Sequence, residues 1–312
     1  MMCSNQNEEK EGPDPPAGYS CNTMLKICYF LGFLDLVDTE PKVPSNITEY
    51  KDIVYKKTGS RNLKLDIYQP KYIKQLVPVL VFIHGGGWKK GNKADYLRYL
   101  VDFAQKGYVT ATISYRFSQE AVFPAAVEDV KCAIRWIRTH AKDYQIDADK
   151  IAVIGGSAGG HLAMMIAYSS DVKEFDKGCD SDSVSSKVQV VVNLYGPSDL
   201  TTEYAIAQSS PQKFIGGLYK TDSTKYKEAS PLFYITPDDP PTLIFHGTID
   251  DLVPVTQSDK LKQKLDEMGV PNEYHRLEGW PHTMDLAVSV NEYCQFYMTK
   301  FFEEYIPIDN RD

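Results

Sequence analysis

The sequence predicts an α/β fold in which a mostly parallel sheet is covered by helices on both faces. Strand-like and helix-like segments alternate from about residue 50 onward, an order that is typical of parallel sheets. Val77–His84 is a continuous apolar run followed by glycines, as expected of a strand buried on both faces. Asp52–Thr58 and Leu63–Tyr68 flank a glycine-containing turn, so they predict an antiparallel hairpin at one edge of the sheet.

The other elements follow from turn signals and side-chain periodicity. Pro124 begins a helix in which apolar residues recur at three- and four-residue steps between Val127 and Ile137, the pattern of a core-facing stripe. Gly107 and Gly269 each follow a helical segment, and glycine commonly ends a helix. Further strands are expected at Tyr108–Ser114, Ile151–Ile154, Val188–Leu194, Thr242–Phe245 and Glu273–Leu277. Further helices are expected at Asp95–Lys106, Ala158–Ser169 and Leu286–Phe302.

Length alone allows two domains, because the chain of 312 residues is about twice the ~150 residues of an average domain. No internal repeat and no linker divides residues 50–306, so we expect one domain there. The stretch 199–239 is rich in Ser, Thr, Lys and Pro and lies between two core strands. It predicts a small cap over the carboxyl edge of the sheet. Residues 1–49 form an arm that begins polar and acidic.

Charge and cysteine usage exclude several classes of partner. The chain has 34 Lys and Arg against 42 Asp and Glu, a net charge of −8, which argues against nucleic acid as a partner. Its six cysteines contain no C-x-x-C pair and are interpreted as unpaired thiols of a cytoplasmic protein, with secretion or lipid anchoring left open. No metal-ligand spacing and no glycine-rich nucleotide motif occurs, so neither a metal nor a cofactor is expected.

The arm contains one apolar segment, residues 24–34, with a single charge at Lys26. It is shorter than the ~20 apolar residues that cross a bilayer, so no transmembrane span is expected. It also lacks the basic start of a signal peptide. A helix packed on the domain is the favoured interpretation. An apolar flap over a substrate entrance, or a shallow contact with a membrane, is the alternative.

The strongest chemical motif is Gly155-Gly156-Ser157-Ala158-Gly159, which lies between a predicted strand and a predicted helix. A G-x-S-x-G sequence in this context indicates a nucleophile elbow, the sharp turn that exposes a reactive serine. We therefore expect Ser157 to be the nucleophile. The N–H of Ala158 begins the following helix, where it can stabilise negative charge on a substrate oxygen.

A second motif, His84-Gly85-Gly86-Gly87-Trp88, directly follows a buried strand. Consecutive glycines let the backbone turn so that several amides converge on one small anion. The N–H groups of Gly86, Gly87 and Trp88 are therefore expected to form an oxyanion hole together with Ala158. His84 is expected to hold this loop in place rather than to react.

A serine hydroxyl needs a neighbouring base, and the base needs an acid that orients it. Candidates for both lie downstream of Ser157. The strand at Thr242–Phe245 is followed by Asp250 and Asp251, and the last strand is followed by His282. One helix and one strand fit between Asp250 and His282, so both residues should lie at the same edge of the sheet.

These motifs, in this order, resemble the α/β-hydrolase superfamily, in the branch of HGGGW carboxylesterases that includes acetyl-xylan and feruloyl esterases and borders the hormone-sensitive-lipase-like esterases. The resemblance covers residues 50–306 and rests on the blocks His84–Trp88, Ser114–Arg116, Phe123–Asp129, Gly155–His161, Tyr195–Pro197, His246–Pro254 and His282. It implies nucleophile Ser157, base His282 and acid Asp250 rather than Asp251. It also implies that Arg116 and Asp129 form a structural ion pair. Gly156 departs from the lipase-like branch, and residues 1–49 have no counterpart.

The resemblance implies a serine carboxylesterase for short-chain acyl esters, with acetylated or feruloylated carbohydrate among the possible substrates. Trp88, Tyr195 and Trp280 are predicted to line the substrate site. A kynurenine-formamidase-like amidase and a non-catalytic ligand-binding homologue stay as alternatives. A prolyl-oligopeptidase-like peptidase is disfavoured because no propeller repeats precede the domain. The expected partner is a small-molecule or carbohydrate ester, and the oligomeric state is left open, a homodimer being one option.

Overall fold

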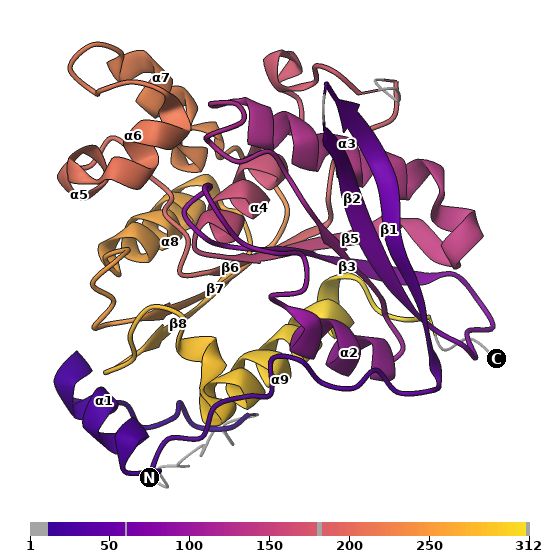
Figure 1. The fold of residues 1–312 in the computed structure, drawn as a ribbon, viewed down its shortest axis with the longest axis horizontal. Helices are drawn as coiled ribbons and strands as arrows, with labels where there is room; N and C mark the ends of the chain where they lie inside the picture. The colour runs from indigo at the N-terminus through magenta and orange to yellow at the C-terminus, as the bar shows by residue number, and fades with distance from the viewer. Residues whose placement is uncertain (1–11, 60, 180–182, 310–312) are drawn as a thin grey trace, which may run out of the picture.

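The computed structural model describes residues 12–59, 61–179 and 183–309, and it has one eight-stranded sheet at its centre. The strands are β1 (Ile47–Thr58), β2 (Arg61–Pro70), β3 (Val77–Ile83), β4 (Val109–Ile113), β5 (Ile146–Gly156), β6 (Val190–Leu194), β7 (Thr242–Gly247) and β8 (Asn272–Leu277). Their spatial order is β1-β2-β4-β3-β5-β6-β7-β8. β1 and β2 pair antiparallel at one edge, β2 pairs antiparallel with β4, and all later pairs are parallel. The predicted α/β fold with an edge hairpin is confirmed (Figure 1).

Helices cover both faces of the sheet. The long helices are α2 (Leu97–Gln105), α3 (Ala125–Thr139), α4 (Ala158–Tyr168), α8 (Thr256–Met268) and α9 (Val288–Tyr305). One face packs against α3, α4 and α8, and the other packs against α2 and α9 (Figure 1). Along β3, Val79 and Val81 belong to the first core and Leu80 and Phe82 to the second. This alternation explains why β3 is apolar throughout.

Helix ends agree closely with the sequence prediction, whereas one strand start does not. Pro124 immediately precedes α3, and Gly269 follows α8 with φ +71°, a conformation that favours glycine. β5 begins at Ile146, five residues before the predicted start at Ile151. Ile146 is buried and pairs with Val77 across a register shift, but residues 147–150 are exposed or half-buried and mostly charged, so they lack a strand-like pattern.

The stretch predicted to form a cap follows β6. It contains three short helices, α5 (Glu203–Ala207), α6 (Ser209–Ile215) and α7 (Ser223–Glu228), and the 3₁₀ turn η3 (Pro231–Tyr234). Figure 1 shows α5–α7 grouped to one side of the sheet. Other 3₁₀ turns are η1 (Ala141–Tyr144), η2 (Lys173–Phe175) and η4 (Met284–Leu286).

The N-terminal arm carries one helix, α1 (Asn22–Phe30), at the edge of the molecule (Figure 1). None of its residues is buried, although Leu25 packs against the core beneath α9. Phe30 and Phe33 are 82% and 76% exposed. Among the helices of the described residues, none is both long and apolar enough to cross a membrane.

The interpretation of all six cysteines as unpaired thiols is wrong. Cys132 in α3 and Cys179 form a disulfide, with their Cα atoms 5.5 Å apart. The two cysteines are 47 residues apart, and tertiary packing brings them together near Asp176, which forms ion pairs with two basic side chains of α3. No local spacing could reveal this pair. Cys21, Cys28 and Cys294 are free thiols, and Cys3 and the first part of the acidic arm lie outside the described residues.

Candidate active site

Ser157 occupies a sharp turn between β5 and α4. Its backbone angles, φ 56° and ψ −123°, lie in a region that non-glycine residues rarely adopt. The turn is held by the Ser157 N–H, which donates to Leu194 O at 2.9 Å. A Cβ on Gly159 would lie 2.0 Å from Ile83 O, so only glycine lets α4 approach β3 this closely. The sequence therefore folds here into the predicted elbow geometry.

The glycine loop of the HGGGW motif faces this turn. Gly86 has φ +104°, and a Cβ there would lie 2.1 Å from Lys90 O. Within the described residues, the N–H groups of Gly86, Gly87 and Ala158 donate to no acceptor. The ring of His84 stacks on Tyr115 at 4.4 Å, and its Nδ1 lies 2.9 Å from Gly85 O. These contacts hold the glycine loop close to Ser157: a Cβ on Gly85 would lie 3.4 Å from Ser157 Cβ.

Trp88 belongs to this loop, but its side chain serves mainly to anchor it. The indole is 3% exposed and stacks on Phe214 of α6 at 4.5 Å. Its Nε1–H donates to His161 Nδ1 at 3.3 Å. Trp88 still borders the cavity described below, so its predicted role in contacting substrate stays a prediction.

Asp250 and His282 are brought together at the carboxyl edge of the sheet. The carboxylate Oδ2 of Asp250 lies 2.6 Å from Nδ1 of His282. Its Oδ1 accepts hydrogen bonds from the N–H groups of Leu252 and Val253, both at 2.9 Å. Burial alone would raise the pKa of Asp250, but hydrogen bonds from His246 and His282 and attraction to His282 lower it to about 2. Asp250 is therefore ionised and oriented toward His282.

The neighbouring His246 also supports Asp250, with Nε2 3.2 Å from Asp250 Oδ2, and Asp251 has a different partner. His246 is fully buried, with Nε2 2.8 Å from Val253 O and Nδ1 2.7 Å from Ser258 Oγ, so it anchors the loop that carries Asp250. Asp251 is exposed, and its Oδ2 accepts a hydrogen bond from Asn22 of α1 at 3.3 Å. Of the two candidate acids, Asp250 is thus the one that contacts the imidazole.

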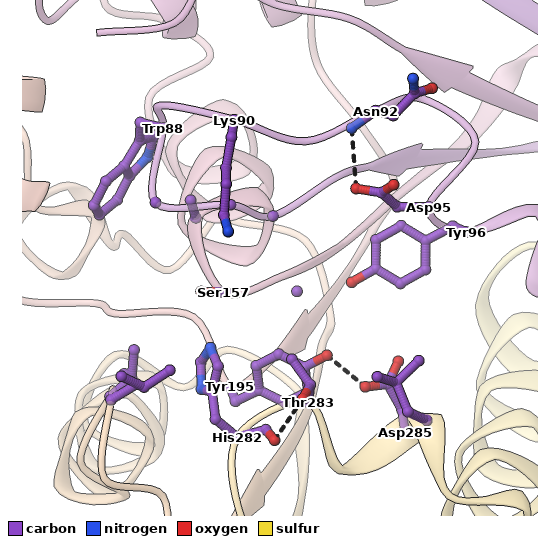
Figure 2. A pocket seen from close by; sticks show the side chains of 18 of the residues that line it. Trp88, Lys90, Asn92, Asp95, Tyr96, Ser157, Tyr195, His282, Thr283 and Asp285 are labelled. Atoms are coloured by element: carbon purple, nitrogen blue, oxygen red, sulfur yellow. Dashed lines mark hydrogen bonds between the residues drawn. The ribbon is translucent and has the colours of Figure 1, made fainter. Parts of the chain in front are cut away.

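One cavity of about 800 Å³ contains both Ser157 and His282. Its walls include the glycine loop, the segment around α5 and α6, the loop that carries Asp250, the N-terminal arm and the region where α2 faces η4. The arm contributes Val37, Thr39 and Glu40. Figure 2 shows Ser157 between the glycine loop on one side and His282 and Tyr195 on the other. The described residues contain no group of three or more His, Cys, Asp or Glu placed to hold a metal ion.

The two remaining predicted substrate contacts differ in position. Tyr195 lines the cavity, and its ring lies 4.7 Å from the ring of His282. Trp280 does not line the cavity, so its predicted position needs correction. Its Nε1–H donates to Pro16 O at 2.9 Å, and its ring lies 5.5 Å from that of Tyr19. The N-terminal arm covers this tryptophan, and the sequence contained no signal for that long-range contact.

The cavity side chains that were missed from the sequence include Tyr96, Tyr99 and Asp285. The tyrosines lie at the start of α2 in a pattern that a core-facing helix also produces. Asp285 is three residues beyond His282, and this proximity was the only available signal. Arg116 and Asp129 do form the ion pair that the resemblance implies, through two hydrogen bonds of 2.8 Å.

Comparison with known proteins agrees with this architecture. The sequence matches the BD-FAE family over residues 65–265. It is 33% identical over 250 residues to the probable carboxylic ester hydrolase LipM of Mycobacterium tuberculosis, covering 76% of this chain and 57% of LipM. It is 31% identical to esterase LipQ of the same organism, covering 80% of this chain and 62% of LipQ. The chain thus spans about three-fifths of the length of these curated relatives.

Solved structures of esterases resemble the whole domain. Thermogutta terrifontis esterase 2, phosphonylated by sarin, has a TM-score of 0.75 and 27% identity, covering 88% of this chain and 100% of the esterase. A truncated carbohydrate esterase from gut microbiota has a TM-score of 0.71 and 29% identity, covering 82% of this chain and 95% of that one. Together with the family match over most of the domain, these likenesses show that the chain has the α/β-hydrolase fold and belongs to the BD-FAE family.

Proposed function

We propose that this protein is a serine carboxylesterase that hydrolyses short-chain acyl esters through an acyl-enzyme intermediate. The observation that carries the proposal is the 2.6 Å contact between Asp250 and His282 in a cavity shared with Ser157 and a loop of free N–H groups. The names of LipM, LipQ and esterase 2 support ester hydrolysis, and the carbohydrate esterase supports acetylated or feruloylated carbohydrate as one substrate class.

In the proposed reaction, Nε2 of His282 takes the proton of Ser157 as Oγ attacks the ester carbonyl. The N–H groups of Gly86, Gly87 and Ala158 then bind the oxyanion. His282 returns the proton to the leaving alcohol, and a water molecule repeats the sequence to release the acid. Asp250 holds the imidazole with Nδ1–H toward its carboxylate and stabilises the imidazolium. Ser157 Oγ makes no hydrogen bond within the described residues, so the serine and histidine must close together when substrate binds.

The disulfide is evidence about the cellular compartment in which the protein resides. Disulfides persist mainly in oxidising environments, so Cys132–Cys179 favours an extracytoplasmic location over the cytoplasmic one expected from the sequence. The purified protein can be denatured without reductant and treated with a maleimide, and a second sample can be reduced first. Two additional labelled cysteines in the reduced sample, counted by mass spectrometry, show that these two thiols are paired.

Organophosphate labelling tests the serine mechanism directly. Paraoxon should add one diethylphosphoryl group to the wild-type protein and none to Ser157→Ala, as measured by intact-protein mass spectrometry. Ser157→Ala should also lower the kcat for p-nitrophenyl acetate on the order of 10⁶-fold, to background. Turnover retained by a folded Ser157→Ala protein would refute the assignment. Unlabelled, inactive wild-type protein would favour the non-catalytic alternative, and faster turnover of N-formylkynurenine than of acetyl esters would favour the amidase.

A further inference from the structure

The cavity has a wall of hydroxyl and carboxyl groups that the proposed mechanism does not use. This wall, which we name the tyrosine–aspartate wall, is formed by Tyr96, Tyr99, Tyr195 and Asp285. Figure 2 labels Tyr96, Tyr195 and Asp285. It lies directly beside the candidate nucleophile. A Cβ built on Gly156, the residue before Ser157, would be 2.1 Å from the Tyr96 hydroxyl and 3.0 Å from the Tyr195 hydroxyl. A substrate group next to the reacting ester therefore falls within reach of the wall.

Asp285 is an acid that is buried without a cation. It is 4% exposed, and its Oδ1 accepts a hydrogen bond from the Tyr195 hydroxyl. No Lys, Arg or His of the described residues forms an ion pair with it, and the polar groups that face it are the hydroxyls of Tyr195 and Tyr99 and its own backbone N–H. Burial raises the pKa of Asp285, and the Tyr195 hydrogen bond, the backbone N–H of Asp285, attraction to His282 and the nearby Tyr99 hydroxyl only partly oppose this. A buried carboxyl that faces only hydroxyls and one backbone N–H, with no cation, is stabilised when a ligand supplies a further donor.

Tyr99, whose hydroxyl lies near Asp285, provides a second observation. Its side chain is 3% exposed and lines the same cavity. Its hydroxyl lies near the Asp285 carboxyl but makes no hydrogen bond of ordinary length and angle among the described residues. Buried polar groups are nearly always paired in folded proteins, so an unpaired hydroxyl facing a cavity indicates a missing ligand group. Tyr99 can accept from a ligand as well as donate, which matches the acceptor at Asp285.

We propose that the tyrosine–aspartate wall is a subsite for a hydrogen-bond donor on the substrate, a hydroxyl or an ammonium group, carried close to the ester. The inference rests on the proposed esterase activity and narrows its substrate class to donor-bearing short esters. An analogue without the donor leaves the Tyr99 hydroxyl without a hydrogen bond and Asp285 with no donor beyond those of the protein. Sites built around buried polar groups discriminate strongly against analogues that lack the matching group.

Isosteric esters measure this preference. Methyl glycolate, glycine methyl ester and methyl propionate differ only in a hydroxyl, ammonium or methyl group on the acyl side. Ethylene glycol monoacetate and propyl acetate make the same comparison on the alcohol side. The readout is the ratio of kcat/KM for each donor ester to that of its apolar isostere. Dividing by the same ratio for hydroxide-catalysed hydrolysis removes differences in intrinsic reactivity.

Wild-type protein should prefer at least one donor ester by about tenfold or more. Tyr99→Phe and Asp285→Leu should both lower that ratio, whereas Asp251→Asn, an exposed acid outside the cavity, should not change it. Asp285→Asn separates the two donors: it should abolish a preference for ammonium but preserve a preference for hydroxyl, because the amide still accepts a hydrogen bond. Tyr99→Phe removes only the unpaired hydroxyl and therefore should fold even where Asp285→Leu does not.

A failure of the subsite proposal can be distinguished from a failure of the esterase proposal. Wild-type turnover of propyl acetate and methyl propionate with no donor preference on either side would overturn the subsite while leaving the esterase intact. Ratios that are the same within twofold in wild type, Tyr99→Phe and Asp285→Asn would do the same. An inactive wild-type protein that paraoxon does not label would instead overturn the esterase proposal, and the subsite with it.

Discussion

Replacing Asp250 by Asn is the sharpest test of the candidate acid. The amide keeps the volume of the carboxylate, and its oxygen can still accept the two 2.9 Å hydrogen bonds from Leu252 and Val253. The loop should therefore stay folded. At the 2.6 Å contact, however, the variant has an amide N–H₂ facing His282 Nδ1, or an oxygen without negative charge. The imidazole then adopts the wrong tautomer, and the imidazolium loses its counter-charge.

The magnitudes follow from these contacts. Loss of the correct tautomer and counter-charge should lower kcat by about 10³–10⁴-fold. The pKa of Asp250 falls from its ordinary value of 3.8 to about 2 in the folded protein. Since its pKa is depressed by folding, ionised Asp250 stabilises the fold above pH 3.8, by about 2 kcal/mol, and this stabilisation is lost as the pH falls toward 2. Asp250→Asn should thus cost stability at pH 7 and little at pH 2.

Asp251→Asn is the matched control. Asp251 is the adjacent acid, but it is exposed and accepts a hydrogen bond from Asn22 instead of contacting His282. The kcat for p-nitrophenyl acetate at pH 8 gives the catalytic effect, and urea unfolding at pH 7 gives the stability effect. Asp251→Asn should change kcat by less than about twofold and stability by less than about 0.5 kcal/mol. The reasoning fails if Asp251→Asn loses as much activity as Asp250→Asn, or if Asp250→Asn retains activity within tenfold of wild type.

Two further predictions concern the fold that supports the site. Gly159→Ala places a methyl group 2.0 Å from Ile83 O, so it should destabilise the protein by about 3 kcal/mol in urea unfolding; Gly217→Ala, where no atom lies within 4 Å, should be neutral. Equal effects of the two substitutions would contradict the close approach of α4 to β3. Removing the 47-residue disulfide loop with Cys132→Ser and Cys179→Ser should cost about 4 kcal/mol, whereas Cys21→Ser, at an exposed free thiol, should cost almost nothing. An unchanged denaturation midpoint in the double variant would show that the disulfide does not restrain the unfolded chain.

The sequence could predict the parts of the site that follow directly from strands. Ser157 follows β5, and Asp250 and His282 lie on loops after β7 and β8. A parallel sheet brings the ends of all such strands to one edge, so the chain order of these residues was enough to predict their meeting. The hydrogen bond between Asp250 and His282 follows from the strand topology of the sheet, and the apolar runs of the sequence indicated where its strands lie.

Residues whose neighbours come from distant segments could not be placed in this way. Tyr99 lies on α2, which packs against α9 across the core, and only that packing places its hydroxyl near Asp285. The disulfide likewise depends on how the segment before Cys179 meets α3. Periodicity identifies which face of an element is apolar, but it does not identify the partner element or which polar group will lie at the contact.

Trp280 shows the same limit and also changes the interpretation of the N-terminal arm. The arm contacts the loop of the candidate acid through Asn22, which donates to Ile249 O at 3.3 Å. It contacts the loop of the candidate base through the Tyr19 N–H to Gly279 O at 2.9 Å and through Pro16 O, which accepts from Trp280. Further along, Val37 N–H donates to Leu286 O at 2.9 Å.

One segment therefore ties together the two loops that carry Asp250 and His282, and residues 37–40 then continue into the cavity wall. A flap that opened over the entrance would have to break these backbone hydrogen bonds and expose Trp280, whose side chain is 2% exposed. The contacts favour a fixed strap over a moving flap. Because the strap spans both loops, a change in the arm should act on the relative position of acid and base, even though no residue before Val37 lines the cavity among the described residues.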